Sequence, residues 1–412
     1  MHLMRENAEA PTGRALMGQP VVGVLQAAAL VLALGLGVLV VAFAIGNLFP
    51  AGSNTYTMRS AVVWMWLGPD LVILSLIALT LAAIVLIHNP QRLSSIATVI
   101  ALGAFTCSSV IMGTIVVATH RDGGSVNFFT ALRPHADAVI ADHTETYTTA
   151  DGQDLHALIF VPKVARPAAP VIMYIHGGGW AAGSAQVSAS AMRTFADAGF
   201  VAVDIDYELA TPSNPTWNKA PAQVACALTW TKQQVSRWGG DPARIAVMGD
   251  SAGGNLAVNL GWSAGQGTAA SSCPALGPVP TPSAVVAAYP VVNPADSYDH
   301  GVPSGSDPKT FIGEYLGGAP SQHLDRLVAI SSLSYASANA PPTLILEPER
   351  DDFIPAQGVY EVADLARARG VRLTLDRIPF AHHLFDGLPG TLGEQVKRSI
   401  VFHYLQGLRL AP

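Results

Sequence analysis

The hydrophobic positions divide the chain into two regions with different patterns. Three long runs in the first 120 residues consist almost only of Val, Leu, Ala, Gly, Ile and Phe, and their cores hold no Lys, Arg, Asp or Glu. An amphipathic helix of a globular domain has polar residues at every third or fourth position, whereas a membrane-crossing helix needs about 20 apolar residues in a row. The pattern therefore predicts about three transmembrane helices within residues 1–120, at about 21–48, 68–88 and 96–118.

The start of the second predicted helix carries several signals. Trp64 and Trp66 precede it, as aromatic residues at a membrane interface often do. Gly68-Pro69-Asp70 is expected to form the turn that begins the helix, with Asp70 as an interfacial cap rather than a buried intramembrane group. A cleaved signal sequence ending near Ala42-Phe43-Ala44 is the alternative, but the first run is too long and two more runs follow it.

Arginines beside these runs do not decide the orientation. With the N-terminus inside, each side of the membrane carries the same number of arginines, so the positive-inside rule decides little. The inner side has Arg5, Arg14 and Arg92, and the outer side has Arg59, Arg121 and Arg133. If the N-terminus is cytoplasmic, three crossings place the C-terminal part on the extracytoplasmic face. A multi-pass membrane protein with this topology is the prediction.

From about residue 144 onward, short apolar or β-branched runs alternate with helical patterns. Residues 121–143 are mixed and polar and predict a juxtamembrane linker, so the second domain is expected over 144–412. The predicted strands are 155–161, 171–176, 201–206, 245–248, 284–289, 343–347 and 372–377, and the predicted helices are 187–198, 220–238, 252–262, 356–369 and 391–406. Such alternation predicts an α/β fold, a mostly parallel sheet covered by helices on both faces.

Two stretches interrupt the alternation in this second domain. Residues 263–282 are rich in Gly, Ala, Ser and Pro, which is typical of a loop. Residues 293–335 follow a strand and contain a possible short helix near Phe311–Leu316. Active sites of α/β sheets lie at the carboxyl ends of the strands. A long excursion there is therefore expected to form a cap or a substrate wall.

Composition sharpens this picture. Only 13% of the 412 residues are charged, against about 25% in an ordinary soluble domain, which agrees with a lipid-embedded part. A net charge of −6 offers no basic surface for nucleic acid. The three cysteines form no C-x-x-C, and no H-E-x-x-H occurs. Neither a disulfide, a structural zinc site nor a metalloprotease is expected, and no metal or cofactor is implied.

The first candidate for chemistry is Gly249-Asp250-Ser251-Ala252-Gly253-Gly254, which follows an apolar strand and leads into a helix. A serine between two glycines at such a turn is the layout of a nucleophile elbow. The glycines remove side chains that would collide in a strained turn. The serine hydroxyl is then held at a helix N-terminus, where backbone N–H groups favour developing negative charge.

A second motif supplies the complementary group. His176-Gly177-Gly178-Gly179-Trp180 follows the strand that ends at Ile175. Three adjacent glycines leave backbone N–H groups unobstructed, so the turn can direct two of them at one oxygen. Acyl transfer needs such donors, because the carbonyl oxygen becomes an oxyanion in the tetrahedral intermediate.

A serine nucleophile also needs a base and an orienting carboxylate, which in this order of elements follow later in the chain. The strand ending at Glu347 runs into Pro348-Glu349-Arg350-Asp351-Asp352, and the next strand leads into Ala381-His382-His383. The order of Ser251, then Asp351 or Asp352, then His382 or His383 is that of a Ser–Asp–His triad. Each group is expected at the carboxyl end of a strand.

With these residues the chain resembles the hormone-sensitive-lipase-like branch of the α/β-hydrolase esterases and lipases. The resemblance is carried by the two glycine motifs, by Asn255 and by the late Asp and His loops. Asp206-Tyr207-Glu208-Leu209-Ala210 also resembles the D-Y-R-L-A segment of that family, with Glu208 in the place of its Arg. The resemblance covers about 145–410, and the membrane region is an addition to it.

The resemblance implies a role for each matching residue. Ser251 matches the nucleophile, and the H-x-F ending of the family matches His383-Leu384-Phe385, which makes His383 the base. Two family patterns select Asp351 as the acid, while Asp352 is the runner-up because Gly358 lies at the family's spacing from it. Pro348 stands where relatives have Gly or Ala.

The same resemblance implies an oxyanion hole and a reaction. Its donors are the backbone N–H groups of Gly178, Gly179 and Ala252, with Gly177 shaping the turn and His176 anchoring it. The expected activity is hydrolysis of small-molecule or lipid carboxylic esters through an acyl-serine intermediate, without a metal or cofactor and beside membrane lipid. An acyltransferase using the same triad and a non-catalytic membrane scaffold are the alternatives, and the oligomeric state stays open.

Overall fold

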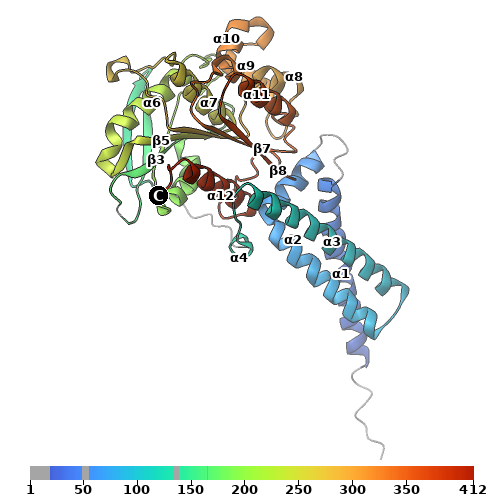
Figure 1. Cartoon of the computed structure of the whole chain (residues 1–412). Coiled ribbons are helices and arrows are strands. Elements are labelled where there is room, and N and C mark those ends of the chain that lie inside the picture. The colour runs from blue at the N-terminus through green and yellow to red at the C-terminus, as the bar shows by residue number, and fades with distance from the viewer. Residues whose placement is uncertain (1–18, 49–54, 133–138, 165) are drawn as a thin grey trace, which may run out of the picture. The chain divides into compact units, whose positions relative to one another are not determined.

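The computed structural model describes residues 19–48, 55–132, 139–164 and 166–412 (Figure 1). They form two compact units. One contains the described residues of Met1–Ile45 together with Asp70–Ile111, and the other contains those of Gly46–Pro69 and Met112–Pro412. Arg5, Arg14 and Arg133, which entered the orientation count, lie outside the described residues.

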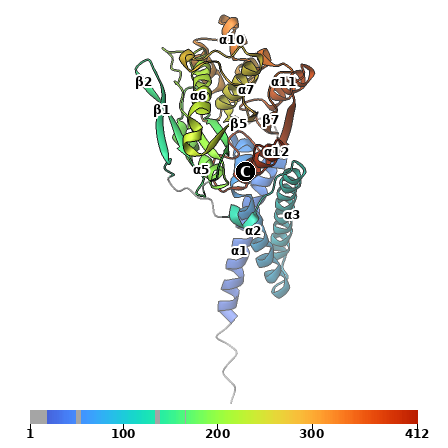
Figure 2. The same ribbon diagram turned by 60° about the vertical axis from the view of Figure 1, so that its left-hand side comes forward.

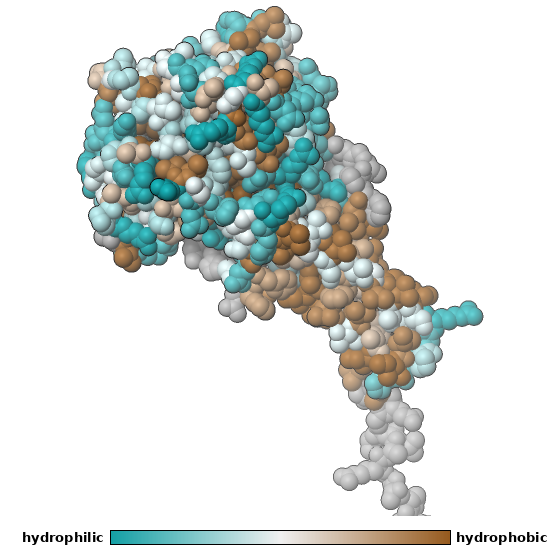
Figure 3. All heavy atoms as spheres, viewed as in Figure 1, coloured by the Kyte–Doolittle hydropathy of each residue, from teal (hydrophilic) through white to brown (hydrophobic). Residues whose placement is uncertain are grey.

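The first unit is built from parts of three long apolar helices, α1 (Gln19–Leu48), α2 (Thr55–His88) and α3 (Arg92–Arg121). All three are long and apolar enough to cross a membrane. A core of small side chains lets them approach closely, as is common between helices in lipid: Ala33, Ala78, Ala82, Ala97 and Ala101. The face of these helices that Figure 3 shows is mostly apolar, with a few polar patches. The predicted three long apolar helices are therefore present.

Helix α2 differs from the prediction at its start. It begins at Thr55 rather than near Gly68, and Gly68-Pro69 instead marks a break inside the helix. Leu67 has non-helical angles (φ −125°, ψ 16°), because a proline inside a helix removes one hydrogen bond and its ring clashes with the preceding turn. The segment Thr55–Leu67 belongs to the second unit.

The second unit contains an eight-stranded sheet in the order β1-β2-β4-β3-β5-β6-β7-β8. The strands are β1 (His143–Ala150), β2 (Gln153–Phe160), β3 (Ala169–Ile175), β4 (Val201–Ile205), β5 (Gly240–Asp250), β6 (Ala284–Ala288), β7 (Thr343–Pro348) and β8 (Leu373–Ile378). The β1–β2 and β2–β4 pairs are antiparallel and the others are parallel. The predicted mostly parallel α/β sheet is confirmed.

Helices cover this sheet on both faces. Figures 1 and 2 show α6, α7 and α11 on one side of the central strands and α5 and α12 on the other. These helices are α5 (Ala189–Asp197), α6 (Ala220–Gln234), α7 (Ser251–Gln266), α11 (Ala356–Ala368) and α12 (Leu392–Gly407). Because both faces are covered, every residue of β3, β4, β6 and β7 is buried.

Short helices fill the remaining connections. The excursion predicted over 293–335 contains α8 (Pro294–His300), α9 (Pro308–Leu316) and α10 (Leu324–Ile330), and α9 coincides with the predicted short helix. A single turn, α4 (Phe128–Ala131), lies in the linker. The 3₁₀ turns are η1 (Ala185–Ser188), η2 (Val235–Trp238), η3 (Pro274–Leu276), η4 (Pro320–Gln322) and η5 (Ser332–Tyr335).

The expectation that the cysteines form no disulfide is wrong. Cys226 on α6 is bonded to Cys273, just before η3, with a Cα–Cα distance of 5.2 Å. The two residues are 47 positions apart, so no local pattern could reveal their contact. The fold returns the segment before η3 onto α6, where Ser272 donates its backbone N–H to the Ala222 carbonyl at 2.9 Å.

Candidate active site

Ser251 stands at a strained turn between β5 and α7. Its φ of 53° lies in the left-handed region, which costs free energy for any residue with a side chain. The flanking glycines are required by close backbone contacts. A Cβ on Gly249 would lie 2.4 Å from the Gly253 carbonyl oxygen, and one on Gly253 would lie 2.1 Å from that of Ile175. The turn therefore holds the serine hydroxyl at the end of the central strand.

Two side chains from later loops meet this serine. The Nε2 atom of His383 lies 3.0 Å from the Oγ of Ser251, and its Nδ1 lies 2.6 Å from Oδ2 of Asp351. The second carboxylate oxygen of Asp351 accepts the backbone N–H of Ile354 at 3.0 Å. Ser251, His383 and Asp351 are only 5%, 6% and 4% exposed. The three form a continuous chain of buried hydrogen bonds.

Two aromatic rings hold the His383 imidazole between them. The ring centroid of Tyr289 lies 4.6 Å away at an interplanar angle of 60°, and that of Phe353 lies 4.9 Å away. Tyr289 is itself fixed, because its hydroxyl donates to Asp386 at 2.6 Å. The imidazole is thereby oriented by packing as well as by hydrogen bonds.

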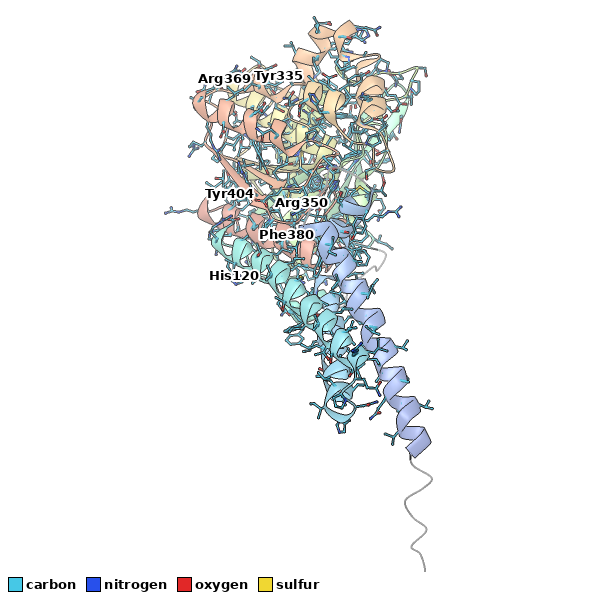
Figure 4. The ribbon with its side chains drawn as sticks, turned by 90° about the vertical axis from the view of Figure 1, so that its right-hand side faces the viewer. His120, Tyr335, Arg350, Arg369, Phe380 and Tyr404 are labelled. Atoms are coloured by element: carbon cyan, nitrogen blue, oxygen red, sulfur yellow. A yellow bond between two sulfur atoms is a disulfide. The ribbon has the colours of Figure 1, made fainter. Side chains whose placement is uncertain are left out.

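The loops that carry the acid and the base are joined to each other. The backbone N–H of Arg350 donates to the Ala381 carbonyl at 3.0 Å. The Arg350 guanidinium lies over the ring of Phe380, 5.3 Å from its centroid, and Figure 4 shows the two side chains together. Asp352, the runner-up acid, instead contacts His382, with 2.5 Å between Oδ1 and Nε2.

The loop after β3 presents glycine backbone beside Ser251. Gly178 and Gly179 have φ values of 113° and 62°, and a Cβ on Gly178 would lie 2.1 Å from the Ala182 carbonyl oxygen. Ala252 lies in the first turn of α7, where N–H groups have no partner within the helix. Gly178 and Gly179 line the same cavity as Ser251, so their backbone is close to the serine that the sequence predicts as the nucleophile.

His176 connects this loop to the body of the domain. Its Nδ1 donates to the Gly177 carbonyl at 2.7 Å, and its ring stacks on Tyr207 with 4.4 Å between centroids. The Tyr207 hydroxyl donates to the His176 carbonyl at 3.0 Å. Burial lowers the pKa of His176, so its imidazole is neutral at pH 7. These contacts agree with a structural role.

A cavity of about 640 Å³ opens over Ser251. Several residues that line it were not assigned to the site from the sequence, among them Met58, Val62, Trp66, Thr310, Phe311, Glu314, Phe353 and Leu384. The spacing of Met58, Val62 and Trp66, four residues apart on one helix face, was a signal in the sequence. The neighbouring apolar run favoured the interpretation of Trp64 and Trp66 as interfacial residues.

A second cavity of about 410 Å³ shares Trp66, Gly178 and Leu384 with the first. Its walls include the buried ion pair of Lys397 with Asp386. Burial alone lowers the pKa of Lys397, but Asp386 and Asp250 reverse this and raise it above the usual range. Within the described residues, no group of three or more His, Cys, Asp or Glu side chains is arranged to hold a metal ion.

The α/β-hydrolase class is defined by a mostly parallel sheet whose central strand ends in a serine-bearing turn. A histidine and an aspartate from two later loops meet that serine. The chain belongs to the BD-FAE family, whose family model matches residues 158–364, half of the chain. The resemblance to the hormone-sensitive-lipase-like branch is confirmed at the level of family and fold.

Individual proteins agree with this membership. Carboxylesterase NlhH of Mycobacterium tuberculosis is 39% identical over 109 residues, covering 26% of this chain and 33% of that protein. Esterase LipQ of the same species is 28% identical over 250 residues, covering 58% of this chain and 55% of that protein. The chain thus spans about half or less of the length of these curated relatives.

Solved structures extend the comparison to the fold. Thermogutta terrifontis esterase 2, phosphonylated by sarin, superposes with a TM-score of 0.56 at 23% identity, covering 65% of this chain and 95% of that one. At this identity the likeness establishes the shared α/β-hydrolase fold.

Proposed function

We propose that this chain is a membrane-anchored serine hydrolase of carboxylic esters. The observation that carries the proposal is the hydrogen-bonded chain from Ser251 through His383 to Asp351, with links of 3.0 and 2.6 Å, at the floor of a cavity bordered by the glycine loop. The names of the relatives, a carboxylesterase and an esterase, support ester bonds as the target.

The first half of the proposed reaction forms an acyl-serine. The Ser251 Oγ attacks the ester carbonyl carbon while Nε2 of His383 takes the hydroxyl proton. The carbonyl electrons move to oxygen, and the N–H groups of Gly178, Gly179 and Ala252 stabilise that oxyanion. The C–O bond to the alcohol then breaks, His383 returns the proton to the alkoxide, and Asp351 stabilises the imidazolium in between.

The second half releases the acid and restores the serine. Water attacks the acyl carbon and gives one proton to His383. The tetrahedral intermediate collapses, the bond to Ser251 Oγ breaks, and the proton passes from His383 to the serine. The products are the carboxylic acid and free Ser251. An alcohol in place of water would make the same site an acyltransferase.

Membrane anchoring rests on the three apolar helices, each long enough to cross a bilayer. The Cys226–Cys273 disulfide supports the extracytoplasmic face for the catalytic unit, because disulfides persist in oxidising compartments. Three crossings then leave the N-terminus in the cytoplasm. Alkaline phosphatase fused after Pro412 should be active in intact cells. If only a fusion at the N-terminus were active, the catalytic unit would lie in the cytoplasm and the proposed topology would be wrong.

The activity test uses the full chain in detergent or nanodiscs. Wild type should hydrolyse p-nitrophenyl butyrate and be labelled by a fluorophosphonate probe, and Ser251→Ala should lose both. Ser263→Ala is the matched control, since Ser263 is a buried serine on the same helix that donates to the Asn259 carbonyl. An unlabelled wild type would favour the scaffold alternative, and products esterified to an added alcohol would favour the acyltransferase.

A further inference from the structure

The segment Thr55–Leu67 of α2 packs against the catalytic domain within the same unit. Ala61, Trp64 and Met65 have no exposed surface. The Trp66 ring lies over the loop after His383, with its Cζ2 3.6 Å from the position that a Cβ of Gly387 would occupy. The Ser304 hydroxyl donates to the Met58 sulfur. This stretch is therefore an integral part of the catalytic unit.

One face of this segment is directed into the catalytic cavity. Met58, Val62 and Trp66 stand four residues apart and all line the cavity that contains Ser251. Side chains at this spacing lie in one row along a helix. Together with Leu384 they make an apolar wall beside the serine. Val63, the next residue on the helix, is half-buried and does not line the cavity.

Another part of the cavity lining has a different character. It includes Phe311 and Phe353 together with two carboxylates, Asp307 and Glu314. Among the described residues, no Lys or Arg side chain lines this cavity. An anionic headgroup would meet carboxylates and no counter-charge, which is unfavourable at short range. An uncharged ester with an apolar chain fits both parts of the lining.

The same helix continues toward the predicted bilayer. Trp66 is five residues before Leu71, where the long apolar part of α2 begins, which corresponds to about 7.5 Å along a helix axis. Because the link is this short, Trp66 stays within about two helical turns of Leu71, whatever the angle at the break.

We propose that Thr55–Leu67 forms the acyl-chain wall of the active site, with Met58, Val62 and Trp66 setting the accepted chain length, and that an uncharged lipid ester reaches this wall from the bilayer into which α2 continues. The proposal rests on the ester hydrolysis proposed above. It makes the part of α2 that precedes the predicted transmembrane stretch a specificity element of the enzyme.

The wall is tested with p-nitrophenyl butyrate, octanoate and laurate. Val62→Phe fills the cavity and should lower the laurate-to-butyrate ratio of kcat/KM about ten-fold. Val63→Phe adds the same ring to a face outside the cavity and should leave the ratio unchanged. Val62→Ala, which enlarges the cavity and is mild for folding, should raise the ratio. Equal ratios in wild type and both Val62 variants would overturn the proposal.

Delivery from the bilayer is tested with dilauroylglycerol in proteoliposomes. Hydrolysis should be at least about ten-fold faster when enzyme and substrate share vesicles than when they occupy separate ones, while butyrate hydrolysis is the same in both. Equal dilauroylglycerol rates would overturn membrane delivery. Fluorophosphonate titration distinguishes failure of this proposal from failure of the proposed function. A wild type that is not labelled and turns over no ester would contradict the proposed ester hydrolysis, whereas a labelled and active wild type with unchanged ratios would contradict only the acyl-chain wall.

Discussion

The Oδ1 atom of Asp352 lies 2.5 Å from Nε2 of His382, and the neighbouring pair, Asp351 and His383, is joined at 2.6 Å through Nδ1. Two His–Asp pairs thus lie side by side on the same two loops. They differ in what remains available on the imidazole. His383 directs its Nε2 at Ser251, whereas the Nε2 of His382 is occupied by Asp352. Only the first pair has the geometry of a base and its orienting acid.

Replacing each aspartate separately tests this distinction. Asp351→Asn should reduce kcat by a factor on the order of 10³–10⁴, because an amide cannot hold the required tautomer or stabilise the imidazolium. Asp352→Asn is the matched control and should cost less than about ten-fold. Turnover of p-nitrophenyl butyrate per labelled active site measures both, and the opposite ranking would assign the acid to Asp352.

Removing the disulfide should destabilise the catalytic unit. Cys226 and Cys273 close a loop of 47 residues, for which chain entropy predicts ~4 kcal/mol, or on the order of 10 °C in Tm. Cys226→Ser is therefore expected to melt earlier than oxidised wild type. Cys107→Ser, which removes a free cysteine, should leave Tm unchanged. A Cys226→Ser protein with wild-type Tm would argue against the disulfide.

Asp376 on β8 should make stability depend on pH. Burial, with a smaller contribution from Asp122, raises its pKa to about 6 against an opposing effect of Arg121. The folded state therefore binds the proton of the Asp376 carboxyl group more tightly than the unfolded state does. The stabilisation that the protonated carboxyl gives to the folded state is present below pH 4 and is lost as pH rises to about 6.

Asp376→Asn should accordingly leave Tm unchanged near pH 4 and raise stability at pH 7.5 by ~1 kcal/mol, after allowance for partial exposure. Thermal unfolding at the two pH values measures the difference. Asp364→Asn, at an exposed position on α11, serves as the control. A stabilisation that is equal at both pH values would point to a cause other than titration.

Glu314 on α9 should exclude negatively charged esters from the cavity that it lines. Glu314→Gln keeps the shape and removes the charge, so kcat/KM for a p-nitrophenyl ester with a terminal carboxylate should rise about five-fold relative to the neutral ester. The gain should shrink at high salt. Glu361→Gln, on the exposed side of α11, is the control, and identical selectivity in the two variants would remove Glu314 from specificity.

The candidate site could be predicted from the sequence because each motif is local and lies at the end of a buried strand. The glycines around Ser251 and at 177–179 mark turns that only glycine tolerates, and buried parallel strands read as apolar runs. Strand β1 escaped prediction because its sequence, His143–Ala150, is mostly polar at the sheet edge. Its pairing with β2, rather than its own pattern, makes it a strand.

Long-range contacts account for the other differences. The bond between Cys226 and Cys273 depends on the path of a loop that carries no periodic pattern. The role of Thr55–Leu67 depends on packing against residues more than 200 positions away, such as Ser304 and Gly387. A sequence pattern shows that Trp66 is amphipathic and beside an apolar run, but both a lipid interface and a cavity wall satisfy that description.

The break at Leu67 divides α2 into a segment that lines the cavity of Ser251 and the apolar stretch that is proposed to cross the membrane. In a straight helix, any tilt of the apolar stretch would also move Met58, Val62 and Trp66. Because Pro69 interrupts the hydrogen-bond ladder, bending at this point is inexpensive, and a helix adjusts to bilayers of different thickness chiefly by tilting. If α2 crosses the bilayer as proposed, the break lets its apolar stretch change tilt with membrane thickness, and the side chains that line the cavity of Ser251 stay in place.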